Sequence, residues 1–172
     1  MRVKKAAAAI VSKQVEAPSQ SAAVRREAEA EIRTLVARHA PAHPRLVDST
    51  RKWLQTRLPT AHEIVYEYRD CFVISYSPNE HGYEGVFALR ASLKGLSLYL
   101  NQGKGLPDPA KLLKGSGKQV RFIDLDSAST LAHPDVASLI DAALARNPVP
   151  YPPVGRGSVV IRSTAAKQRR ST

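Results

Sequence analysis

Hydrophobic residues recur at a helical spacing in the first part of the chain. Within residues 21–39, Val24, Ala28 and Ile32 are four residues apart, which places them on one face of a helix. Ser21 stands where the N-cap of this helix is expected, because its hydroxyl can accept from a free amide of the first turn. The pattern therefore predicts an amphipathic helix over 21–39.

The same spacing continues beyond a short proline-containing break. Residues 45–58 form a second amphipathic stretch, and Pro59 ends it because proline cannot continue a helix. Thr60 and Glu63 have the spacing of a capping box, which predicts a further short helix over 61–67.

From residue 71 the pattern changes to the period of two that is typical of strands. β-Branched and aromatic residues alternate with small or polar ones and predict four strands. The first three, joined by short turns, predict an antiparallel meander. The predicted elements are strands over 71–77, 84–90, 95–101 and 119–125, a short helix over 110–113 capped by Asp108, and an amphipathic helix over 134–146.

This order of elements predicts an α+β fold, in which an antiparallel sheet of four to six strands has helices packed against it. We expect one domain over residues 21–146, preceded by a disordered basic tail over 1–20. Residues 147–172 are expected to form a Pro-rich linker, a candidate extra strand at 158–162 and a second basic tail.

The chain has 172 residues and a formal charge of +11, most of it near the two ends. Residues 1–26 carry six Lys or Arg and one Glu, and residues 147–172 carry five Lys or Arg and no acid. Residues 27–146 therefore have a net charge of only +1. Basic ends attract polyanions such as nucleic acid without reading a sequence, or they are simply solvated tails.

Composition excludes several classes of protein. A single cysteine excludes an intramolecular disulfide framework and a cysteine-rich zinc site. No stretch approaches the roughly 20 apolar residues of a membrane span. The apolar run from Ala6 to Val11 is shorter than the core of a signal peptide. We expect a cytoplasmic protein without a membrane partner, and the sequence leaves its oligomeric state open.

The best candidate for chemistry is a basic, glycine-containing segment over 104–121. Five Lys or Arg there oppose only Asp108, and glycine loops let backbone amides approach an anion closely. A small anionic ligand or a phosphate backbone could bind there, although a solvated basic face has the same pattern. The candidate ligand-binding residues, including two on the adjoining strand, are Tyr99, Asn101, Lys104, Lys118 and Arg121.

Other chemistry has weaker signals. Residues 115–118 resemble a phosphate-binding loop but lack its first glycine and its final Ser or Thr. Glu63 and Glu67 share a face of the predicted short helix and could hold a cation weakly, but no second His or Cys follows at ligand spacing. We therefore expect no cofactor, no dedicated metal site and no catalytic constellation, and we favour a protein that is not an enzyme.

The order of several short motifs resembles the YdhG-like domain-of-unknown-function family over about residues 45–146. The motifs are Leu58-Pro59, the three-strand meander, Ser97–Gly103, Leu106–Pro109, Leu112–Lys118 and the closing helix. The resemblance implies a small cytoplasmic α+β domain with a curved antiparallel sheet. One member of the family has been described as a frataxin-like iron chaperone, and the family supplies no established catalytic residues.

These observations predict a non-catalytic binding domain for a small or anionic ligand or for a protein partner. Two alternatives stay open. One is a protein that associates with nucleic acid through its basic tails, and the other is a frataxin-like iron carrier that uses Glu63 and Glu67.

Overall fold

The computed structural model describes residues 20–163, so the predicted basic tail over 1–20, except Gln20, and the end of the second basic tail over 164–172 lie outside the described residues. The helices are α1 (Ala22–His39), α2 (Pro44–Arg57) and α3 (Pro134–Arg146), with a 3₁₀ helix at Ala128–Ala132. The strands are β1 (His62–Glu67), β2 (Cys71–Ser77), β3 (Phe87–Ser92), β4 (Gly95–Leu100), β5 (Arg121–Leu125) and β6 (Val159–Ser163).

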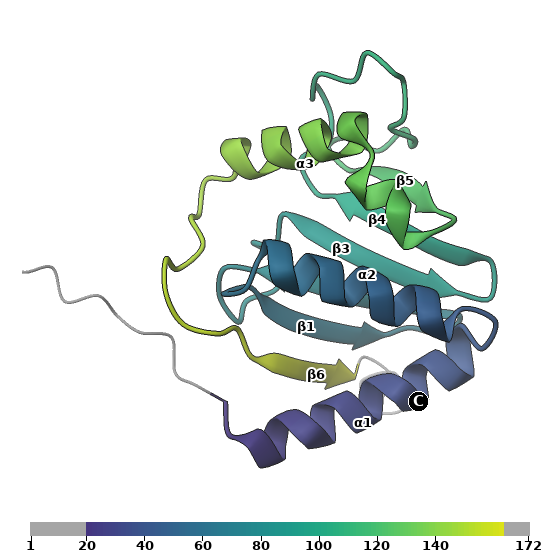
Figure 1. The fold of residues 1–172 in the computed structure, drawn as a ribbon, viewed down its shortest axis with the longest axis vertical. Coiled ribbons are helices and arrows are strands. Elements are labelled where there is room, and N and C mark those ends of the chain that lie inside the picture. The colour runs from purple at the N-terminus through teal and green to yellow at the C-terminus, as the bar shows by residue number, and fades with distance from the viewer. Residues whose placement is uncertain (1–19, 164–172) are drawn as a thin grey trace, which may run out of the picture.

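One six-stranded sheet, in the order β5-β4-β3-β2-β1-β6, organises the molecule (Figure 1). Neighbouring strands from β1 to β5 are antiparallel, and β6 alone runs parallel to its neighbour β1. The predicted meander and the candidate extra strand are both confirmed. The α+β class is confirmed as well, because helices cover the sheet.

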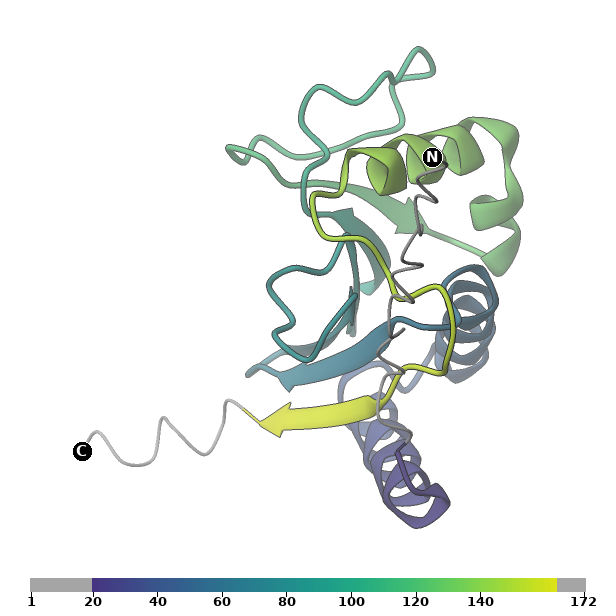
Figure 2. The same cartoon turned by 90° about the vertical axis from the view of Figure 1, so that its left-hand side faces the viewer.

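All three α-helices lie on one side of the sheet, and loops project on the other (Figure 2). Alternating side chains of each strand face the helices and make the core. On β2 these are Phe72, Ile74 and Tyr76, all with 0% exposure. Among the described residues, no helix covers the opposite side, which we call the open face.

Each α-helix begins at a residue type that favours a helix N-terminus. The Ser21 hydroxyl accepts from the Val24 amide and caps α1, and Pro44 and Pro134 occupy the first turns of α2 and α3. Within residues 20–163, no helix is both long and apolar enough to cross a membrane.

The short helix predicted over 61–67 is wrong, because these residues form strand β1. Every residue of β1 pairs with β2, and five of the six also pair with β6. The hydrogen bonds of two neighbouring strands outweigh a local capping signal. Glu63 faces α2 instead of capping a helix.

The short helix predicted over 110–113 is also wrong. The Asp108 carboxylate accepts from the amides of Leu112 and Leu113, both at 2.9 Å, so it caps a turn. Lys111 has a φ of 55° and so leaves the right-handed helical region. A helix cannot continue through that residue.

Residues 147–158, which we call the arm, connect α3 to β6 across the molecule (Figures 1 and 2). The Tyr151 hydroxyl donates to the Tyr76 carbonyl at 2.7 Å, and burial raises the pKa of Tyr151 to about 12. Near the end of the arm, the Ser158 amide donates to His62 Nδ1 at 3.3 Å. The fold therefore includes the arm and β6 as well as the predicted domain over 21–146.

Candidate functional site

A buried carboxylate lies between the sheet and α2. Glu63 on β1 is 2% exposed, and its two oxygens accept four hydrogen bonds. Arg51 donates to both oxygens at 3.1 and 2.8 Å, Gln55 donates at 2.9 Å and the Tyr76 hydroxyl at 3.0 Å. Alternate side chains of a strand point to the same face, so Glu63, Val65 and Glu67 of β1 all lie on the helix side.

Arg51 joins this acid to a second one on α1. Its two terminal nitrogens donate to the Glu29 carboxylate at 2.9 and 3.1 Å. Burial alone would lower the pKa of Arg51, but its bonds to Glu29 and its attraction to Glu63 are stronger, so the pKa is raised. Arg51 therefore stays charged and neutralises part of the charge on two acids.

The same pairs affect the other ionisable groups of the cluster. The hydrogen bonds from Arg51 lower the pKa of Glu29, so that residue is ionised at neutral pH. Burial, and then repulsion by Glu63, raises the pKa of Tyr76 well above its ordinary value. Tyr76 therefore remains a neutral hydrogen-bond donor.

Two hollows of about 360 and 400 Å³ open beside this cluster. They share Arg25, Gln55, Arg156 and Gly157, so we treat them together as the arginine cleft. Cationic groups outnumber acids along its walls. The charged residues that line it are Arg25, Arg26, Lys52 and Arg156, with Glu29 and Glu63.

Two arginines from distant parts of the chain meet in this cleft. Burial, and then repulsion by Arg156, lowers the pKa of Arg25. The Nε atom of Arg25 is buried without a hydrogen-bond partner among the described residues. Arg156 makes no hydrogen bond or ion pair with residues 20–163. The cleft therefore holds an excess of positive charge that the described residues do not neutralise.

The arm brings Arg156 to the cleft through a very close backbone approach. A Cβ atom on Gly157 would lie 1.7 Å from the Ala61 carbonyl oxygen, so only glycine fits there. Arg25 also donates to the Gly157 carbonyl, at 3.3 and 2.9 Å. These contacts fix the segment that carries Arg156 against α1 and the start of β1.

The structure divides the predicted site residues between two places. Tyr99 lies on the open face, where its ring stacks on Phe122 with centroids 5.1 Å apart. Asn101 follows β4 and lines the same hollow of the open face as Tyr99. Its side-chain amide donates to the Gly85 carbonyl, so part of its hydrogen-bonding capacity is already used.

The predicted basic residues belong to the loop over 101–120 and its junction with β5. Lys104 and Lys118 are exposed, and neither side chain has a hydrogen-bond or ion-pair partner among residues 20–163. Arg121 donates to the carbonyls of Gly117 and Val120, both at 2.7 Å, and thereby holds the loop. Of the five predicted residues, Tyr99 and Asn101 line a hollow of the open face, whereas Arg121 pairs with Leu100 and so faces the helix side. None of the five lines the arginine cleft.

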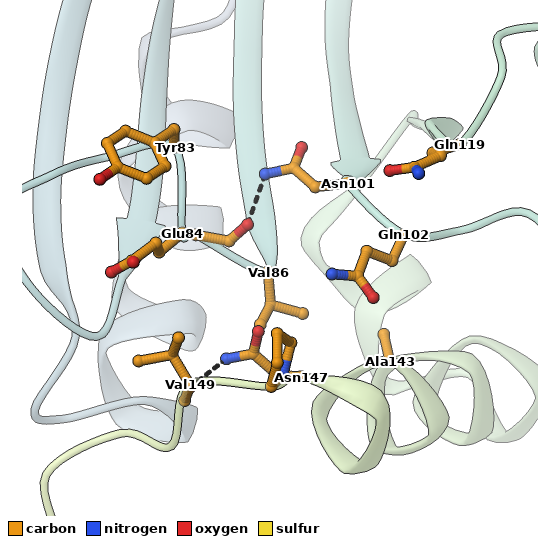
Figure 3. A pocket seen from close by; sticks show the side chains of 11 residues that line it. Tyr83, Glu84, Val86, Asn101, Gln102, Gln119, Ala143, Asn147 and Val149 are labelled. Carbon is orange, nitrogen blue, oxygen red and sulfur yellow. Dashed lines mark hydrogen bonds between the residues drawn. The ribbon is translucent and has the colours of Figure 1, made fainter.

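A separate cavity of about 250 Å³ lies between the end of β4, the β2–β3 loop and the end of α3 (Figure 3). Four carboxamides line it, with Val86, Ala143 and Val149 as apolar walls. Asn101 and Asn147 each donate to a backbone carbonyl. None of the lining residues is Lys or Arg, so this cavity does not suit an anion. Its carboxamides are Asn101, Gln102, Gln119 and Asn147.

The carboxylates weighed for metal binding are engaged elsewhere. Glu63 is held by its four donors, and Glu67 accepts from Arg38 and from His39. Among residues 20–163, no three His, Cys, Asp or Glu side chains gather as a metal site. The single cysteine, Cys71, is buried, and burial raises the pKa of its thiol.

The sequence did not indicate the arginine cleft. Its residues come from α1, α2, β1, β2 and the arm, and only the folded chain brings them together. The one local signal is Arg156 between two glycines, a combination that can place a charged side chain close to another backbone.

These features define a small α+β domain with a charged cleft on its helical side and an exposed sheet on the other. No protein-family model, curated protein or solved structure matches the chain. We therefore infer function from the geometry and charge of these two surfaces.

Proposed function

We propose that this protein is a non-catalytic binding domain for a small anionic ligand, which it holds in the arginine cleft. The observation that carries this proposal is the pair Arg25 and Arg156, which line both hollows of the cleft and repel each other there. An anion between them would accept hydrogen bonds from both guanidinium groups and would offset that repulsion. Guanidinium groups suit phosphate and carboxylate because their donors can bind two oxygens at once.

The acids of the cleft do not argue against an anion. Glu29 and Glu63 are bound to Arg51, so part of their negative charge is already compensated. Lys52 and Arg26 add two more cations to the walls. The net field at the cleft therefore favours a negative ligand.

The chemistry of the lining favours binding over catalysis. A general base needs a pKa near the working pH and a free lone pair. Glu63 accepts four hydrogen bonds, and the raised pKa of Tyr76 keeps its proton in place.

Membership of the YdhG-like family remains a prediction, and the observed α+β class is compatible with it. The alternative of an iron carrier has less support, because Glu63 and Glu67 both bind cationic side chains of the protein itself.

Thermal unfolding with a panel of anions tests the proposal. Phosphate, pyrophosphate and citrate serve as probes, each compared with sodium chloride at equal ionic strength. A ligand that binds only the folded state raises the Tm, and the rise grows with its concentration. We expect at least one anion to do this, and we expect Arg156→Gln to abolish the effect. Arg156 is exposed, so its replacement should leave the fold intact.

Arg45→Gln is the matched control, because Arg45 is an exposed arginine in the first turn of α2, away from the cleft. This variant should respond to the anion as the wild type does. An equal response from Arg156→Gln, or no response to any anion, would reject the arginine cleft as the binding site.

A further inference from the structure

The open face presents an aromatic surface that the helices leave uncovered. The rings of Tyr99 on β4 and Phe122 on β5 are stacked, with an interplanar angle of 24°. Both side chains are half-buried, so part of each ring remains accessible. Tyr68, just after β1, is 46% exposed and lines a hollow together with Tyr99.

Two hollows of about 530 and 510 Å³ extend along this face and share Arg90 and Tyr99. One continues over Phe122 and around the sheet edge to His43 and Leu46 at the start of α2. The other reaches Tyr68 and the small side chain of Ala88. The result is a continuous shallow surface across β2 to β5, with aromatic rings and an arginine near its middle. Such an open surface is long enough to hold an extended chain.

Positive charge gathers beside this surface. Residues 90–126, which contain β4, β5 and the loop between them, carry seven Lys or Arg and three Asp. Their net charge of +4 exceeds the +1 of the whole body over 27–146. In Figure 2 the loop over 101–120 lies at the top edge of the sheet, and part of it extends to the side of the open face.

Asp70, Asp124 and Asp126 line the two hollows, and the first two are paired within the protein. Asp124 accepts from Ser97 and from Lys114, and Asp70 lies 4.0 Å from Arg90. Asp108 accepts from two backbone amides of its own loop. Lys104 and Lys118 remain without an acidic partner among the described residues, so they are available to an external polyanion.

We propose that the open face binds single-stranded nucleic acid. Bases stack on the Tyr99–Phe122 pair, and Lys104 and Lys118 bind the phosphate backbone. Aromatic platforms bordered by Lys and Arg favour single strands, because every base has a face for stacking and a duplex hides those faces. A protein partner would match the aromatic rings but would leave the excess of positive charge unexplained. This site is separate from the arginine cleft and does not depend on the ligand proposed there.

Fluorescence anisotropy with the full chain and a labelled oligo(U) of about 12 nucleotides tests this proposal, since one small domain typically contacts 4–16 nucleotides. We expect tighter binding to the single strand than to a duplex of equal length. Tyr99→Leu keeps apolar packing but removes the stacking surface, and should weaken binding about fivefold to a hundredfold. Tyr99→Phe keeps the ring and should bind as tightly as the wild type, because stacking needs the ring. Weak binding by Tyr99→Phe would instead assign the effect to the hydroxyl.

Tyr83→Leu is the control, because Tyr83 is 77% exposed but belongs to the β2–β3 loop and lines neither hollow. If Tyr99→Leu fails to fold, Lys104→Gln with Lys118→Gln replaces it, since both lysines are exposed. That double variant should lower affinity and reduce the dependence on salt.

Three results would overturn the proposal. One is an absence of oligonucleotide binding. Another is equal affinity for single strand and duplex, unchanged by Tyr99→Leu, which would assign binding to the basic ends. The third is self-association that depends on Tyr99 without any binding of nucleic acid, which would make the open face an interface between two copies.

Discussion

Glu63 is the residue on which the polar cluster depends, because it holds three side chains at once. Glu63→Ala would leave Arg51 with Glu29 alone and would remove the acceptor of Gln55 and Tyr76. Breaking one partner of a buried ion pair costs about 3–5 kcal/mol. We expect a decrease of that size in the free energy of unfolding, measured by urea denaturation.

Asp141→Ala provides the comparison for this prediction. It breaks the pair between Arg57 and Asp141, whose side chains are 44% and 64% exposed. Such surface pairs contribute about 0–1 kcal/mol. If Glu63→Ala cost no more than Asp141→Ala, the cluster would not stabilise the fold as described.

This residue also shows why the site could not be predicted from the sequence. A charged residue is normally taken as exposed, so Glu63 interrupts the apolar pattern by which strand β1 would be predicted. Its spacing from Thr60 instead favoured a helix cap. Its partner Arg51 lies on another element, and Arg156 is almost 100 positions further along the chain. Periodicity identifies which face of an element is buried, but it does not identify the partner of a buried charge.

At the scale of elements, ion pairs and a histidine hydrogen bond attach α1 to its neighbours. Glu29 binds Arg51 of α2, and Glu67 of β1 binds Arg38 and His39 of α1. The hydrogen bonds from Arg51 lower the pKa of Glu29, and those from His39 and then Arg38 lower the pKa of Glu67. Acid should therefore weaken the docking of α1.

The direction of this effect follows from proton linkage. An unfolded Glu has a pKa of about 4.3, and the folded values of Glu29 and Glu67 are lower, so the unfolded chain binds more protons in that range. The stability they provide is complete above the unfolded pKa and is lost as pH falls through the folded values. Urea midpoints measured from neutral pH down through this range should decrease accordingly.

Glu29→Gln combined with Glu67→Gln should flatten that decrease, since amides do not titrate there. Glu31→Gln, an exposed change on the same helix, serves as the control and should follow the wild-type curve. An unchanged slope in the double variant would mean that other carboxylates cause the acid sensitivity.

Most elements could be predicted because their signals are local. Ser21, Pro59 and the alternation over 71–77 each mark a structure within a few residues. The pairing of β6 with β1 could not be predicted, because a parallel pairing between segments almost 100 residues apart leaves no pattern in the sequence of either strand. A short Val- and Ile-rich stretch indicates a strand without indicating its neighbour.

At the scale of the whole molecule, the arm couples the edge of the sheet to the arginine cleft. Gly157 lies against the Ala61 backbone, Arg25 holds its carbonyl, and Arg156 precedes it at the cleft. Gly157→Ala would force a methyl group to within 1.7 Å of the Ala61 carbonyl oxygen, and neither backbone can yield without moving β6 from β1. We expect a loss of at least about 2–3 kcal/mol in the free energy of unfolding.

Because Arg156 would move with the arm, the same variant should also lose the rise in Tm that an anion produces. Amide hydrogen exchange should show faster exchange in β6 and along the β1 edge that it covers, while β3 and β4 keep their protection.

Gly117→Ala is the matched control, since its methyl group would lie 3.6 Å from the nearest atom, an ordinary contact. A Gly157→Ala protein with wild-type stability and anion response would show that the arm does not control the cleft. Loss of stability with the anion response retained would separate β6 docking from the placement of Arg156.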